Sequence, residues 1–182
     1  AAREAKDNGA TWAIAKSQAA TSNSLNAVMG SLQRGQSTID VAISAGETVA
    51  DLLTQMKEKA LAASDSTLDT ASRTALNEDF KSLRDSIAKA VSNAEFNGAN
   101  MIKTNGATIK ALANADGTSK ITVAAVNLGL GGGNVGVLST STIGTVTTAT
   151  AMIATITSSI TAVSTALSKL GTGSKTIGNH LT

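Results

Sequence analysis

A proline-free run of regularly spaced small and apolar residues is the feature that most constrains the fold of this chain. Spacings that alternate between four and three residues keep such positions on one face of an α-helix, in the register of a coiled coil. Ala, Leu, Lys, Glu and Gln are frequent over residues 8–64, so we predict one helix there, roughly 85 Å long. The positions of this seam are Ile14, Gln18, Thr21, Leu25, Val28, Leu32, Gly35, Ile39, Ala42, Gly46, Val49, Leu53, Met56 and Ala60.

The seam is weak at four of its positions. Gln18, Thr21, Gly35 and Gly46 stand where a strong two-stranded coiled coil would have Leu or Ile. Small residues let two backbones approach closely, but they bury little apolar surface, whereas burying a Leu is worth about 1.5–3 kcal/mol. We therefore expect this helix to need several neighbours.

The composition favours packing by many small contacts and excludes several kinds of chemistry. The 182 residues, for which we expect one domain, include no Pro, Cys or Tyr, and the aromatic residues are Trp12, Phe80 and Phe96. Without Cys the chain has no disulfide, thiolate zinc site, iron–sulfur cluster or catalytic thiol. A formal charge of +2 is too small for the basic field that nucleic-acid binding requires, so we expect no nucleic-acid partner.

A second, shorter helix is predicted after a polar break at residues 65–70, where Asp69 or Thr70 can cap its N-terminus. The short turn makes this helix antiparallel to the first. Asn97 and Gly98 then stop it, as a C-terminal cap or a turn. Its apolar positions are Leu76, Phe80, Leu83, Ile87, Ala90 and Ala94.

The second half of the chain has a different pattern, because all 13 acidic residues lie at or before Asp116. Residues 108–114 and 119–125 flank an Asp-Gly step at 116–117, which is typical of a β-hairpin. The Gly-rich stretch 129–136 is predicted to be a flexible connection. A last helix is predicted over about 147–170, since its apolar spacing outweighs its poor propensity. Thr and Ser interrupt the apolar run at 149–167, so we expect no membrane span.

These elements predict a mainly α fold: an elongated antiparallel helical bundle of two long helices and one shorter helix, coiled-coil-like, with a small β-hairpin region at one end. Residues 1–103 would form the N-terminal part of a rod, from the long helix and the shorter antiparallel one. Residues 104–142 would form the β-hairpin and Gly-rich loop, and residues 143–182 the helix that completes the rod.

Several segments resemble bacterial flagellins. Residues 5–10 (AKDNGA) followed by 13–15 (AIA) are similar to the family pattern A-K-D-D-A-A-G-x-A-I-A, and residues 35–47 to its G-I-S-x-x-Q-T-A-E-G-A-L stretch. The most specific match is 94–98 (AEFNG), which resembles T-x-F-N-G. The resemblance covers residues 1–102 well, and residues 169–171 with the helix before them loosely. Residues 53–60 depart from the segment L-Q-R-x-R-E-L-A that an animal immune receptor reads, at Gln55 and Lys59.

This resemblance implies a structural subunit of the flagellar filament, extracellular and active in motility. It further implies a homopolymer with other flagellin subunits, with an export chaperone and a cap protein as partners. Residues 104–142 would stand in place of the variable outer domains of the family. The extreme terminal helices through which flagellins polymerise would be missing, so the chain would be the core of the rod.

The sequence predicts no catalytic, cofactor-binding or metal-binding residue. Residues 131–136 fit GxGxxG, but no acidic residue follows Asp116 to hold a ribose, so we expect a linker there. His180 is the only histidine and is expected at an exposed helix position. Glu78 and Asp79 are adjacent, and adjacent helix positions do not converge on one atom.

Two further features leave alternatives open. Trp12 can pack within the bundle or between subunits, or it can stack on a sugar. The Ser/Thr-rich stretch 139–165 is a candidate for O-linked glycan. Alternatives to the filament subunit are therefore a flagellin-like cell-surface receptor or adhesin that binds polysaccharide through Trp12, and a hook–filament junction protein. No enzymatic activity is expected.

Overall fold

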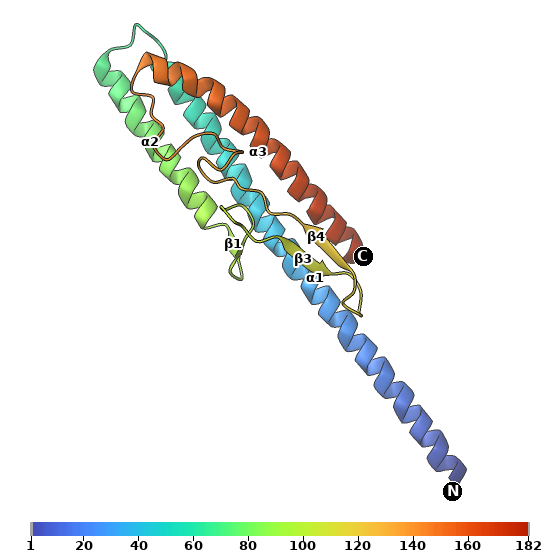
Figure 1. Cartoon of the computed structure of the whole chain (residues 1–182). Helices are drawn as coiled ribbons and strands as arrows, with labels where there is room; N and C mark the ends of the chain where they lie inside the picture. The colour runs from blue at the N-terminus through green and yellow to red at the C-terminus, as the bar shows by residue number, and fades with distance from the viewer. Residues whose placement is uncertain (1, 182) are drawn as a thin grey trace.

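The computed structural model describes the backbone of residues 2–181 and the side chains of residues 8–181. The side chains of residues 5–7, which belong to the predicted motif at 5–10, lie outside the described residues. So do residue 1 of the predicted segment 1–103 and residue 182 of the predicted segment 143–182. Figure 1 shows an elongated molecule in which α2 and α3 both run antiparallel to α1. The elements are α1 (Ala2–Ala63), α2 (Thr70–Ser92), β1 (Glu95–Phe96), β2 (Ala99–Asn100), β3 (Ile109–Leu112), β4 (Lys120–Val123) and α3 (Val146–Leu181). The predicted mainly helical bundle with a small hairpin region is confirmed.

The seam of α1 forms the core of the molecule from Val28 onward. Its residues from Val28 to Ala60 are all buried, and Ala63 extends the set by one position. Gly46 faces α3 closely, because a Cβ there would meet Leu167. Gly35 packs in the same way against Ile109 of β3 and Ile177 of α3. The small residues thus allow α3 and the β-hairpin to approach the α1 backbone.

The helix α3 continues to Leu181, so the predicted end near Leu170 is wrong. Gly171 and Gly173 suggest a terminator in the sequence, but the apolar heptad continues past them to Ile177. The buried heptad positions of α3 are Ala149, Ile156, Val163, Leu170 and Ile177. By length and composition α3 could cross a membrane. Because its heptad face packs against α1 and the β-hairpin, the absence of a span stays our prediction.

The helix α2 begins at the predicted cap and ends earlier than the Asn97-Gly98 step. The Asp69 carboxylate accepts a hydrogen bond of 2.8 Å from the Ser72 amide, and Asn93 forms the C-cap. Asn97 and Gly98, at φ 51° and 80°, instead form the tip of a hairpin between β1 and β2, which the sequence did not predict. Of the two predicted roles, cap or turn, the structure therefore has the turn.

The β3–β4 hairpin is confirmed, with its four pairs running from Ile109↔Val123 to Leu112↔Lys120. Strand β3 packs on α1 and strand β4 on α3. Gly117, at φ 72°, supplies the positive φ of the turn. The hairpin lies beside the end of α3, and α1 continues past both of them (Figure 1).

The Gly-rich segment is packed, so the prediction of a flexible connection is wrong. Val135 and Val137 are fully buried, and the Gly131 amide donates to the carbonyls of both. Gly131 and Gly133 are needed for their positive φ of 70° and 100°, which explains the glycines without flexibility. The segment and the residues after it join α3 to α2, through Gly136 N to Ser159 Oγ at 2.9 Å and Arg84 Nη1 to Ser141 O at 2.6 Å.

Two glycines two residues apart in α3 give a matched test of this close packing. A Cβ on Gly173 would lie 2.5 Å from Cγ1 and 2.7 Å from Cγ2 of Val123, whereas a Cβ on Gly171 meets nothing within 4 Å. We expect Gly171→Ala to raise the free energy of unfolding by up to about 1 kcal/mol through helix propensity. Gly173→Ala should lower it by about 1–2 kcal/mol through overpacking. Urea denaturation measures both changes. Adding Val123→Ala should rescue Gly173→Ala, and equal stabilisation by the two alanines would contradict the packing.

The turn between α1 and α2 makes the stability depend on pH. The hydrogen bond from the Thr67 side chain is the main cause that lowers the pKa of Asp65, and the bond from the Thr67 amide is the second. The side chain and the amide of Ser72 lower the pKa of Asp69 in the same order. A carboxyl with a lowered folded pKa stabilises the fold above its unfolded pKa of about 3.9, and that stabilisation is lost as the pH falls through the folded pKa.

We therefore expect the double variant Asp65→Asn/Asp69→Asn to lose less thermal stability than the parent chain between about pH 6 and about pH 3. Asn still caps a helix N-terminus, so both proteins fold. Circular dichroism melting at the two pH values measures the difference. An equal fall in Tm would show that these carboxylates contribute nothing to the pH dependence.

Candidate functional site

The most unusual surface of the molecule is the first third of α1, which extends beyond α3 and the β-hairpin (Figure 1). The hairpin reaches α1 at Ser31, whose hydroxyl accepts a hydrogen bond of 3.0 Å from the Leu112 amide. Near the end of α3, Gln36 Nε2 donates to Ser174 O at 3.4 Å. Residues 8–23 and 25–27 are exposed along their whole length. We call residues 8–27 the overhang.

The overhang carries the same apolar seam that is buried in the rest of α1. Ile14, Gln18, Thr21 and Leu25 keep the four-three spacing that continues into the buried Val28. Ile14 is 58% exposed and Leu25 51% exposed. We call these four residues the uncovered seam. Its register is continuous with an interface that α3 covers further along, so the surface is shaped to pack against a helix.

The overhang is almost uncharged. Lys16 is its one charged residue, and the Lys16 ammonium lies 4.7 Å from the centre of the Trp12 ring. Trp12 is 64% exposed, so none of the described residues covers it. A cation over a Trp face is worth about 0.5–1 kcal/mol at an exposed site. An uncharged apolar face of this kind marks an interaction surface rather than a solvated one.

Beyond the overhang, the charged side chains of α1 and α2 are exposed or half-buried. Acidic side chains at Asp40, Glu47, Asp51 and Glu58 are all exposed on α1. The ion pairs Lys59–Asp79 at 3.4 Å and Lys81–Glu78 at 3.3 Å are also exposed, so each contributes little to stability. Glu78 and Asp79 thus pair with different lysines and do not converge on one atom.

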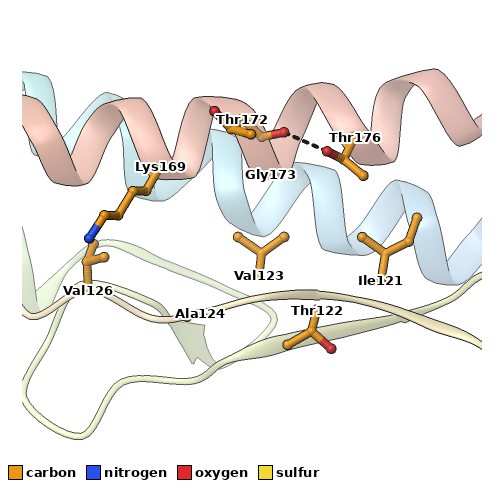
Figure 2. Close-up of a pocket in the computed structure, with 9 residues that line it drawn as sticks. All are labelled: Ile121, Thr122, Val123, Ala124, Val126, Lys169, Thr172, Gly173 and Thr176. Atoms are coloured by element: carbon orange, nitrogen blue, oxygen red, sulfur yellow. Dashed lines mark hydrogen bonds between the residues drawn. The ribbon is translucent and has the colours of Figure 1, made fainter.

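A groove lies between the hairpin and α3 (Figure 2). It holds about 240 Å³ and is lined by Ile121, Thr122, Val123, Ala124, Val126, Lys169, Thr172, Gly173 and Thr176. Figure 2 shows the Thr176 hydroxyl bonded to the Thr172 carbonyl on the helix that forms its upper wall. Lys169 is the one titratable group among these residues, so the groove has no acid–base pair with which to do chemistry.

The other residues singled out in the sequence have structural roles. His180 Nε2 lies 2.7 Å from Ala113 O and joins the end of α3 to the hairpin, at an exposed helix position as predicted. The segment 131–136 forms a packed turn over Ser159 and not the start of a helix. Among residues 8–181 no group of three His, Cys, Asp or Glu side chains could hold a metal ion.

The sequence could not reveal that the seam splits into a covered and an uncovered part. The same spacing runs from Ile14 to Ala60, and it says that a face is apolar without saying what covers it. The one signal available was the placement of Trp12, a large aromatic beside the seam in a chain with few aromatics.

Comparison with known proteins gives consistent matches. The family model described as "bacterial flagellin N-terminal helical region" matches residues 1–108. Flagellin FljM of Caulobacter vibrioides is 54% identical over 178 residues, which cover 98% of this chain and 64% of that protein. Flagellin FljJ of the same organism is 36% identical over 139 residues, or 76% of this chain and 50% of that protein. The chain therefore spans about two thirds, 64%, of the length of the first of these relatives.

The fold has a known counterpart too. The crystal structure of Bacillus cereus flagellin superposes with a TM-score of 0.72 and covers 82% of this chain and 85% of that one, at 19% sequence identity. At this identity the likeness concerns the fold alone. The relatives named here are flagellins, so the comparisons do not favour the alternatives of a polysaccharide receptor or a junction protein.

Proposed function

This chain belongs to the bacterial flagellin family, and from that premise we propose that it is the rod core of a structural subunit of the flagellar filament. The subunit acts by packing its helical faces against other copies and not by chemistry. The observation that carries the proposal is the uncovered seam, an apolar helix face that the described part of the chain leaves bare.

Packing energies explain why such a face suits a polymer. Burying Ile14 and Leu25 is worth about 1.5–3 kcal/mol each, which is too little for a stable complex once the cost of association is included. Contacts repeated along an array add up, so an assembly can be strong although each single contact is weak. When one face of a subunit binds a different face of the next copy, and the rotation between the copies does not close a ring, subunits can be added without limit. A weakly adhesive monomer and a stable filament are therefore compatible.

The partners and location follow from the same premise. We propose other flagellin subunits as the homopolymer partner, an export chaperone and a cap protein as transient partners, and an extracellular position in the flagellum. Exposed hydroxyls such as Thr157, Thr161 and Thr165 are candidate sites for O-linked glycan, although each already donates to a carbonyl four residues back. Residues 104–142 stand in place of variable outer domains, between rod segments at 1–103 and 143–182.

The test alters the uncovered seam in the full-length subunit, produced in a strain that lacks its own flagellins. Ile14→Glu/Leu25→Glu places two charges on the seam and should abolish filaments in negatively stained electron micrographs. Ala19→Glu/Asn26→Glu adds the same charge to exposed positions about 120° around the helix from the uncovered seam, and filaments should form. Equal filament yields from the two variants would show that the uncovered seam is not part of the contact between subunits. Absence of filaments with the unaltered subunit would overturn the proposed function.

A further inference from the structure

Three Asn-Gly steps occur in the chain, at 8–9, 97–98 and 105–106. In such a step the backbone nitrogen of glycine can attack the side-chain amide carbon of asparagine, because glycine has no Cβ in the way. The reaction also requires a backbone that can rotate to bring the two atoms together. The structure places the three steps in different surroundings, so it predicts which of them reacts.

The 97–98 step has the most freedom. Asn97 and Gly98 are exposed at the tip of the β1–β2 hairpin, which is held by two residue pairs, Glu95↔Asn100 and Phe96↔Ala99. A Cβ built on Gly98 would meet nothing within 4 Å. Short two-stranded hairpins are marginal by themselves, so this tip opens at low cost.

The other two steps are held in place. A Cβ on Gly106 would lie 2.8 Å from the Asn100 carbonyl oxygen and 3.0 Å from that of Lys103, so the backbone of Gly106 is packed among main-chain atoms. Gly9 lies inside α1, where helical hydrogen bonding engages its amide and fixes its dihedral angles. Both steps require a larger opening than the hairpin tip does.

The charges around the hairpin tip favour the product. Asn97 lines a cavity of about 230 Å³ together with Arg34 and Lys110, and none of the described residues lining this cavity is acidic. A carboxylate at position 97 would share this cavity with two cations, and Glu95 of β1, two residues before it, does not line the cavity. Such an arrangement stabilises the charged form of the product.

We propose that Asn97 is a site of spontaneous deamidation that converts the hairpin tip from neutral to anionic. The Gly98 nitrogen bonds to Cγ of Asn97, the bond from Cγ to Nδ2 breaks, and ammonia leaves with the proton of the Gly98 amide. Water then opens the five-membered succinimide to aspartate or isoaspartate. Each converted copy gains one negative charge in the cavity that Arg34 of α1 and Lys110 of β3 also line. This inference does not depend on filament formation.

Peptide mass mapping after incubation of the purified chain at mildly alkaline pH tests the site. The peptide that contains Asn97 should gain the mass of deamidation several-fold faster than the peptide that contains Asn105. Asn97→Gln should remove the early product, while the matched variant Asn105→Gln should leave it unchanged. Conversion of Asn105 at an equal or higher rate would overturn the proposal, and so would an unreacted Asn97 under conditions that convert a free Phe-Asn-Gly-Ala peptide.

A second measurement tests the role of the cations. Asn97→Asp produces the aspartate form directly, and NMR titration of its carboxyl should give a pKa below that of the triple variant that also carries Arg34→Ala and Lys110→Ala. Arg34 and Lys110 are both exposed, so their removal leaves the core intact. Identical titration of Asp in the two proteins would show that the cavity does not hold the product.

Discussion

Replacing Phe80 by alanine is expected to lower the free energy of unfolding by about 3–5 kcal/mol, the largest loss from any single side chain in the core. Phe80 is fully buried and is the largest of the fully buried side chains. It lies on α2 and belongs to the one buried cluster that α1, α2 and α3 share. A close-packed core relaxes only partly around a lost side chain, so much of the cavity stays open.

Urea denaturation followed by circular dichroism measures this loss. Leu61→Ala is the control, because Leu61 is 62% exposed and its truncation should change the free energy of unfolding by less than about 0.5 kcal/mol. Similar losses from the two variants would mean that α2 is not held to α1 through a packed core.

Replacing Asn100 by leucine is expected to cost about 2–4 kcal/mol, because the amides of Ile102 and Lys103 lose their acceptor and Val91 O keeps only its longer bond from the Ala94 amide. The Asn100 side chain donates to Val91 O at 2.7 Å and accepts from the amides of Ile102 at 3.0 Å and Lys103 at 3.1 Å. It thereby joins the end of α2 to the chain that follows β2. Leucine has a similar size, so the loss reports the hydrogen bonds and not a cavity.

Asn114 provides a matched control on the outside of the molecule. Its side chain also makes three hydrogen bonds, to the Thr118 hydroxyl and from the Thr118 and Ser119 amides, but in an exposed loop. Water can replace these bonds, so Asn114→Leu should cost less than about 1 kcal/mol. Thermal melts measure the fall in Tm of each variant. Equal falls would contradict the prediction that the buried hydrogen bonds of Asn100 contribute more to stability than the exposed ones of Asn114.

The parts of the fold that local residues determine could be predicted from the sequence. Asp69 is a good N-cap wherever a helix starts, and the Asp116-Gly117 step between β-rich flanks specifies a tight turn without reference to the rest of the chain. For α3, the helical spacing of its apolar residues predicted a helix correctly, although its many Thr residues disfavour one. The hydroxyls of Thr157, Thr161 and Thr165 donate to carbonyls four residues back, which satisfies them within the helix.

The parts that depend on distant contacts could not be predicted. Gly171 and Gly173 are typical of a helix end, yet α3 continues past them to Leu181. At Gly173 the missing side chain leaves room for Val123, and further along the helix Ile177 packs against Gly35 of α1. Glycine content likewise suggested flexibility at 129–136, where the structure has a packed turn. Glycine permits either outcome, and tertiary packing decides between them.

The candidate site shows the same limit. Spacing alone identified Ile14 and Leu25 as seam residues, but the end of the covered region near Ser31 follows from where the hairpin and α3 meet α1. The exposure of Trp12 could be recognised only once that limit was known.

Small-angle X-ray scattering of the 182-residue chain tests most directly whether α1 carries its uncovered seam beyond the bundle. The 62 residues of α1 make a helix of about 93 Å, so the structure predicts a maximum dimension of about 90–100 Å and a distance distribution with a long, thin tail. A radius of gyration of about 16 Å with a symmetric distribution, as a compact chain of this length would give, would contradict the rod and the seam it exposes.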